Sequence, residues 1–111
     1  MKTVCYVDIP DRENGHGVSV RKLLDNAHVQ VAHLLLQPGE VVSPHTTPVD
    51  VFFYILEGFC NVEIGSERTR AGLDTLIESP AGIPHALYNE DARVTRILVV
   101  KTPRPGKKQI P

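Results

Sequence analysis

Two of the five histidines, His45 and His85, stand in surroundings that favour chemistry. Each directly follows a proline and lies a short distance after a glycine, Gly39 for the first and Gly82 for the second. Neutral imidazole nitrogens bind divalent transition metals, and they also act as general bases near neutral pH. The pair therefore indicates either a metal site or a histidine base.

The other three histidines are predicted to be structural. His16 lies between two glycines and His28 follows a turn, so both are expected to be solvated loop residues. His33 is flanked by apolar residues and shares a strand face with Val31 and Leu35. A buried, hydrogen-bonded core histidine is the favoured interpretation, and a pocket-lining role stays open.

The residues around His45 and His85 resemble the two motifs of single-domain cupins. The first cupin motif sets two histidines and a glutamate between two glycines, and the second ends in Pro, Gly, His and Asn at fixed spacing. The matching positions are Gly39, His45 and Gly58 in the first motif and Pro80, Gly82, His85 and Asn89 in the second. The resemblance implies an all-β fold, the antiparallel double-stranded β-helix or jelly-roll barrel.

The resemblance also implies a divalent metal held by His45 and His85. Cupin sites of this kind combine two or three histidines with a carboxylate, a set that suits iron, manganese, nickel or zinc. Thr47 takes the place of one family histidine, and Val51 takes the place of the glutamate. Asp50 is the neighbouring carboxylate, but it should face the opposite side of the strand unless a bulge turns it inward.

Cys60 is expected to face the barrel interior by the family pattern. Its thiolate is one candidate for a third ligand, and a buried cysteine acting as a small hydrophobe is the commoner case. The implied pocket lies in the mouth of the barrel and is lined by His45, His85, Thr47, Val51, Phe53, Cys60 and Leu87.

Short apolar segments separated by Gly and Pro must position these residues. Eight Gly and nine Pro leave little room for helices, so the chain predicts many short strands. Strands are expected over 29–36, 51–56, 60–64, 75–77 and 94–101. We expect residues 18–27 to form a strand and a turn rather than a helix.

One domain is expected, with N-terminal strands and turns over 1–28, a cupin core over 29–103 and a basic tail over 104–111. The tail is expected to be a frayed end, with a strap on a neighbouring subunit as the alternative.

The segment 51–56 has no polar face. Odd positions carry Val51, Phe53 and Ile55, and even positions carry Phe52, Tyr54 and Leu56. One face can line the barrel, and the other needs a cover. A second copy of the chain is the natural cover, so the sequence predicts a homodimer.

The composition limits the partners. Twelve Lys plus Arg against thirteen Asp plus Glu give a net charge of -1, so nucleic acid is not an expected partner. No segment has the length and apolarity of a signal peptide or a membrane span, and neither cysteine fits a zinc-ribbon spacing. We expect a cytoplasmic protein without a membrane partner.

The sequence is consistent with three functions. The first is metal-dependent oxidation or isomerisation of a small molecule. The second is a metal-free enzyme with a histidine base, as in cupin-like sugar epimerases. The third is a ligand-binding or sensing module without catalysis. The sequence does not identify the small molecule.

Overall fold

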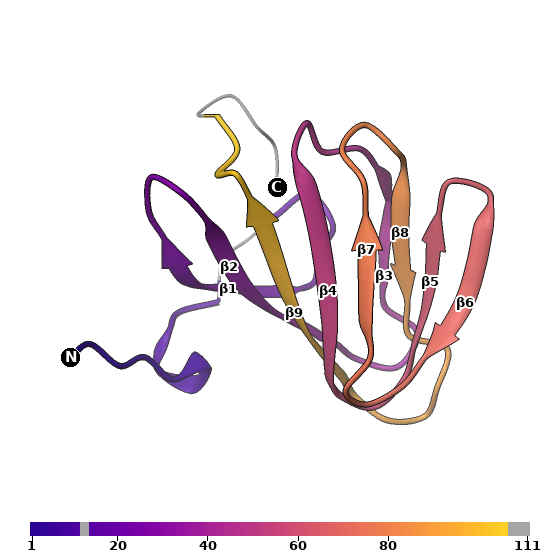
Figure 1. Cartoon of the computed structure of the whole chain (residues 1–111). Coiled ribbons are helices and arrows are strands. Elements are labelled where there is room, and N and C mark those ends of the chain that lie inside the picture. Colours follow the sequence, from indigo (N-terminus) through magenta and orange to yellow (C-terminus); the bar gives the residue numbers. More distant parts are fainter. Residues whose placement is uncertain (12–13, 107–111) are drawn as a thin grey trace.

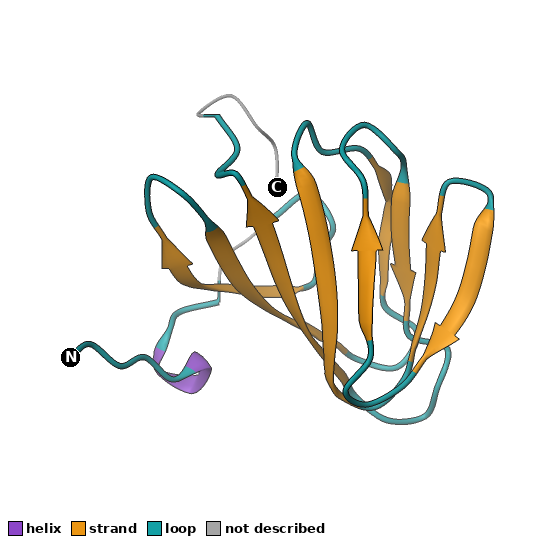
Figure 2. Cartoon of the chain, viewed as in Figure 1, coloured by secondary structure: helices purple, strands orange, loops and turns teal. Residues whose placement is uncertain are grey.

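Two antiparallel sheets face each other in the computed structural model, which describes residues 1–11 and 14–106 (Figures 1 and 2). The first sheet has the strand order β1-β2-β9-β4-β7, and the second has the order β3-β8-β5-β6. The elements are η1 (Tyr6–Asp8), β1 (Ser19–Asp25), β2 (Gln30–Leu36), β3 (Val41–His45), β4 (Asp50–Glu57), β5 (Cys60–Ile64), β6 (Glu67–Ala71), β7 (Leu76–Ser79), β8 (His85–Tyr88) and β9 (Thr95–Thr102). This confirms the predicted all-β jelly-roll fold.

Five strands were predicted at nearly their observed positions, together with the strand and turn over 18–27. The turn after β1 depends on Asn26, whose side-chain oxygen accepts hydrogen bonds from the backbone N–H groups of His28 and Val29. Sequence patterning missed β3, β6 and β8. Pro44 lies within β3, between the paired residues Val42 and His45. A proline is tolerated there because β3 is an edge strand with a bulge at this point.

Strand β4 shows the predicted two apolar faces. Val51, Phe53 and Ile55 are at most 2% exposed and belong to the hydrophobic core. Burying each of these side chains contributes about 1.5–3 kcal/mol. The alternate residues of β4 point to the outside of the first sheet and are only partly buried. The outer face is therefore apolar and incompletely covered in a single chain.

The N-terminal segment covers one part of that outer face. The ring of Tyr6 stacks on His33 with 3.9 Å between centroids and 6° between planes, and the guanidinium groups of Arg21 and Arg96 lie on the Tyr6 ring. His33 is 2% exposed and accepts a hydrogen bond at Nε2 from Arg96 Nε, at 3.0 Å. It is thus buried as predicted, but on the outer side of the barrel wall.

The beginning of the basic tail is held rather than frayed. Arg104 donates its backbone N–H to the His28 carbonyl at 3.0 Å, and its guanidinium pairs with Asp25 at 2.7 Å. Pro105 is buried. Two residues at the β1–β2 hairpin therefore supply the partners that a frayed end lacks. Residues 107–111 of the tail lie outside the described residues.

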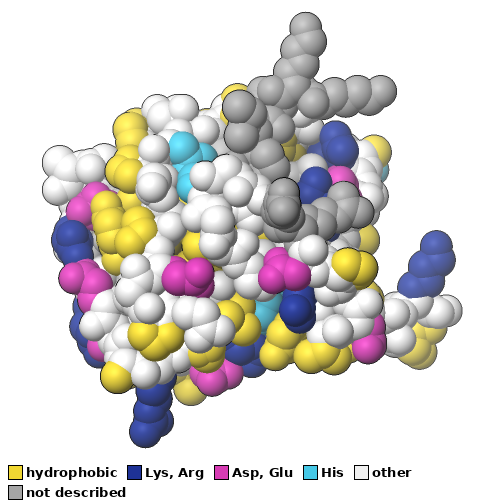
Figure 3. All heavy atoms as spheres, turned by 180° about the vertical axis from the view of Figure 1, so that it is seen from behind, with side chains coloured by type: hydrophobic (Ala, Val, Ile, Leu, Met, Phe, Trp, Pro, Cys, Tyr) yellow, Lys and Arg dark blue, Asp and Glu magenta, His cyan; other side chains and the backbone are white. Residues whose placement is uncertain are grey.

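Charges are mixed on the surface. On the face shown in Figure 3, basic and acidic side chains are interspersed and form no single-sign patch. In the described parts of the chain, no helix has the length and apolarity needed to cross a membrane.

Candidate functional site

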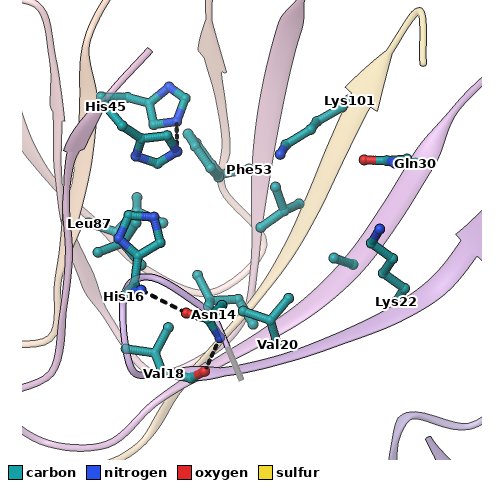
Figure 4. A pocket seen from close by; sticks show the side chains of 15 residues that line it. Asn14, His16, Val18, Val20, Lys22, Gln30, His45, Phe53, Leu87 and Lys101 are labelled. Atoms are coloured by element: carbon teal, nitrogen blue, oxygen red, sulfur yellow. Dashed lines mark hydrogen bonds between the residues drawn. The ribbon is translucent and has the colours of Figure 1, made fainter. Parts of the chain in front are cut away.

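A cavity of about 290 Å³ opens at one end of the barrel. Both sheets and the loop before β1 contribute to it, and Figure 4 shows the side chains that surround it. The apolar part of the lining is Val18, Val20, Ala32, Leu34, Val42, Phe53, Leu87 and Val99. The polar part is Asn14, His16, Lys22, Gln30, His45, His85 and Lys101.

The two motif histidines meet at this cavity. His45 ends β3 and pairs in register with His85, the first residue of β8, after a bulge between Val42 and His45. Their Nε2 atoms lie 3.3 Å apart, and their rings are nearly perpendicular at 79° (Figure 4). Residues 40 positions apart in the chain thus present two nitrogens to one point.

The hydrogen bond at each Nδ1 atom determines whether the Nε2 atom of the same ring carries a proton or a free lone pair. His45 Nδ1 lies 3.0 Å from the Ser43 carbonyl, which only accepts, so Nδ1 donates and the neutral ring keeps a lone pair at Nε2. His85 Nδ1 lies 2.9 Å from Ser79 Oγ, and a hydroxyl can donate or accept. If Ser79 accepts, both Nε2 atoms carry lone pairs and a cation must lie near them. If Ser79 donates, His85 Nε2–H donates to His45 Nε2.

The pair fits two ligand positions of a divalent metal. Two imidazole nitrogens bound to one ion at about 2.0–2.1 Å lie roughly 3.0–3.4 Å apart, depending on coordination geometry. The observed 3.3 Å falls in that range. Among the described residues, no group of three His, Cys, Asp or Glu side chains is placed to hold a metal. Water or the bound molecule would supply the remaining ligands.

Burial keeps His85 neutral. Its side chain is 3% exposed, and desolvation lowers its pKa from 6.5 to about 4, with the positive charges of His45, Lys101 and His16 as further causes. The edge of Phe53 packs against its ring at 5.3 Å between centroids. A neutral imidazole is the form that binds a metal.

Three residues expected in the lining lie elsewhere. Strand β3 ends at His45, so Thr47 falls in a loop, where its hydroxyl donates to the Val49 carbonyl at 3.1 Å. Val51 belongs to the hydrophobic core and is not among the residues that line the cavity. Of the expected residues, Phe53 and Leu87 do line the cavity with the two histidines.

Cys60 is the third displaced residue. Ile64 pairs with His85, and Cys60 stands at the other end of β5, roughly 13 Å away along the strand. Burial raises the pKa of its thiol to about 12, so the thiol stays protonated. Cys60 is a buried small hydrophobe in this fold and not a third ligand.

Asp50 does not turn toward the histidines. The pairing of β4 with β9 is regular from Asp50 to Ile55, so the bulge that would turn Asp50 inward is not present. Its carboxylate accepts a hydrogen bond from the Ala81 N–H at 2.9 Å. Asp50 thus orders the loop that precedes His85 without facing the cavity.

Sequence reasoning misplaced His16. It is half-buried, lines the cavity and lies 4.8 Å from the His45 ring, measured between centroids. Asn14 folds this loop inward, because its side chain accepts from the His16 N–H and donates to the Val18 carbonyl. The Asn-Gly-His-Gly turn was the signal available, and glycines on both sides favoured a solvated loop instead.

Lys101 and Lys22 are further lining residues that sequence reasoning missed. In β9, Lys101 shares its face with the buried Ile97 and with Val99. The period of two along β9 was the signal that could have placed Lys101 inside the barrel.

Comparison with known proteins confirms the family. A model of the cupin domain matches residues 32–101, and the chain belongs to the cupin family. An uncharacterized protein of Methanocaldococcus jannaschii, MJ0764, is 25% identical over 93 residues, covering 83% of this chain and 80% of that protein.

Solved structures are similar over most of the chain. The crystal structure of TT1209 from Thermus thermophilus has a TM-score of 0.82 and 27% identity, over 95% of this chain and 100% of that one. The polyketide cyclase RemF from Streptomyces resistomycificus has a TM-score of 0.82 and 24% identity, over 95% and 81%. The latter likeness shows the fold alone.

Proposed function

We propose that this cupin binds a small molecule in the barrel mouth beside a divalent metal held by His45 and His85. The observation that carries the proposal is the 3.3 Å separation of two Nε2 atoms at the wall of an apolar cavity. Iron, manganese, nickel and zinc all suit imidazole ligands. When bound, such an ion acts as a Lewis acid on an oxygen atom of the molecule, the chemistry of metal-dependent oxidation or isomerisation.

The chain's own residues prepare that site. Ser43 and Ser79 orient the two rings, and Phe53 and Leu87 exclude water from the side that faces the core. The two cysteines are free, which fits the reducing cytoplasm that the sequence favours.

A metal-free binding module is the second candidate. It is favoured by the Ser79 hydroxyl, which can donate to His85 Nδ1 and leave a hydrogen bond between the imidazoles that needs no ion. No carboxylate of the described residues completes a three-ligand site. In this case the cavity holds its ligand by shape and charge alone.

Metal content of the purified chain separates the two functions. We expect one equivalent of a divalent metal after dialysis against the candidate ions, and loss of it in both His45→Ala and His85→Ala. His28→Ala is the matched control, because His28 is exposed in the β1–β2 turn and is not among the residues that line the cavity. Full metal content in both site variants, or none in the unaltered chain, would overturn the metal proposal.

A further inference from the structure

The charged side chains that line the cavity are all positive. Lys22 and Lys101 line the cavity, and no Asp or Glu among the described residues does. The rest of the lining is apolar or consists of imidazole and amide groups. The barrel mouth is therefore a small apolar chamber with cationic groups on one wall.

Two strands of the first sheet, β1 and β9, place the two lysines on that wall. In the first sheet β2 lies between β1 and β9, with Lys22 opposite Ala32 and Lys101 opposite Gln30. The backbones of β1 and β9 are roughly 10 Å apart, a distance that two lysine side chains can span toward one ligand group. Figure 4 shows the amine of Lys101 directed into the cavity toward Phe53 and the histidine pair.

Lys101 is the more unusual of the two. Within the described chain its side-chain ammonium forms no ion pair and donates no hydrogen bond. Burial lowers its pKa, and the positive charge of Lys22 lowers it further. A cation inside a barrel wall is costly without a counter-charge, and the fold itself provides none here.

Lys22 stands at the rim. Its amine is 3.7 Å from the carboxylate of Asp25, but Arg104 holds that carboxylate more closely, at 2.7 Å. Asp25 therefore leaves Lys22 only weakly engaged, so Lys22 can attract an anion toward the opening. Lys101 lies deeper and would bind it.

We propose that the cavity binds a small organic acid whose carboxylate pairs with Lys101, with its apolar part against Phe53 and Leu87. This deepens the proposed function, since it rests on a small molecule occupying the barrel mouth. The volume is near the lower end of the roughly 300–1,000 Å³ of ligand pockets, so the acid is small. A single deep ammonium in an apolar chamber suits a monocarboxylate better than a phosphate, which needs more donors.

Matched pairs of acids and amides test the charge preference. The probes are benzoate, phenylacetate and hexanoate, with benzamide, phenylacetamide and hexanamide as uncharged partners of the same shape. They are titrated into the full-length chain in the presence of EDTA and followed by the backbone amide resonances of β2 and β9. We expect at least one acid to bind about tenfold more tightly than its amide, or roughly 1.4 kcal/mol.

Lysine variants locate the preference. Lys101→Gln should reduce the affinity for the acid to that of the amide, and Lys101→Arg should retain most of the difference because it keeps the charge. Lys22→Gln should cause a smaller, salt-sensitive loss, since rim charges act mainly on association. Lys2→Gln is the matched control at an exposed terminal position and should change nothing.

Several outcomes would overturn the proposal, among them equal binding of acid and amide, a preference that persists in Lys101→Gln, and binding of no acid at all. Tighter binding of inorganic phosphate than of every carboxylate would also reject it. Binding of amides alone would reject the anion while leaving the small-molecule site intact, and a failed metal assay would leave this result unaffected.

Discussion

Ser79 decides the state of the imidazole pair, because its hydroxyl is the group that contacts His85 Nδ1. The hydroxyl accepts when an ion lies near both Nε2 atoms, and it donates when the two rings bond to each other. Ser43 acts differently, since only its backbone carbonyl contacts His45. Removing the side chain of Ser79 should therefore alter the imidazole pair, whereas removing that of Ser43 should not.

Ser79→Ala should lower the affinity for Zn²⁺ by about tenfold or more, because His85 loses the partner that orients its ring. Ser43→Ala should bind Zn²⁺ as the unaltered chain does, since the carbonyl remains. Calorimetric titration of Zn²⁺ into both variants measures the difference. Unchanged affinity in Ser79→Ala would show that the hydroxyl does not orient His85.

His33 should make stability dependent on pH. Burial, with the positive charges of Arg96 and Arg21, lowers its pKa from 6.5 to about 4 in the folded chain. The unfolded chain binds the proton more readily, so the free energy of unfolding should fall as pH drops from about 6.5 toward 4. His85, whose pKa is also about 4, contributes in the same direction.

Urea denaturation between about pH 7 and about pH 4.5 checks this expectation. His33→Gln should flatten the dependence in part, with His85 accounting for the remainder. His28→Gln is the control, because that side chain is exposed, and its curve should match that of the unaltered chain. A steep dependence that His33→Gln leaves unchanged would assign the effect to other groups.

Strands and turns differ in how far the sequence predicted them. Strands without a proline, such as β2, β5 and β9, were predicted because their own residues, rich in Val, Ile and Leu, favour an extended and buried segment. Strands β3 and β8 were missed because Pro44 and Pro84 suggested loops, although neighbouring strands supply enough pairing to hold the segments extended. The cupin motifs located His45 and His85, but the inward position of His16 depends on a turn that brings distant residues together.

The β4–β5 turn should be the most sensitive of the glycine turns. Gly58 has a φ of +76°, and an added Cβ would lie 2.6 Å from the Val94 carbonyl oxygen. Gly58→Ala should therefore lower the free energy of unfolding by about 3 kcal/mol, from backbone strain and the clash together. Thermal or urea denaturation measures the loss.

Gly39→Ala is the matched control for that turn. Gly39 has a φ of +84°, but no atom lies within 4 Å of the added Cβ. Only the backbone strain applies, so the loss should be about 1 kcal/mol. Equal losses in the two variants would mean that the turn moves away from Val94 and relieves the contact.

A single copy of the whole molecule leaves an apolar sheet face partly open. Phe52, Tyr54 and Leu56 project from the outer side of β4, and Leu76 on β7 is 49% exposed beside them. Tyr6 of the N-terminal segment stacks on His33 in β2, whereas the outer residues of β4 remain only partly buried. The homodimer predicted from the sequence would bury this face.

Phe52→Asp should convert a dimer into a monomer, because it would place a charge in a dry contact. We expect the dimer dissociation constant to rise by about a hundredfold. Light scattering coupled to size-exclusion chromatography measures the mass. Ile83→Asp is the control in the β7–β8 loop and should leave the mass unchanged. A monomer mass for the unaltered chain would reject the dimer.

The two cysteines give the chain a built-in labelling site. Cys5 is exposed beside Tyr6, whereas Cys60 is 1% exposed with a pKa raised to about 12. A maleimide dye should react with Cys5 and spare Cys60 while the barrel is folded. The dye would then report, through its fluorescence anisotropy, when the N-terminal segment lifts from His33, without any engineered residue. Labelling of Cys60 would in turn count the molecules whose barrel has opened.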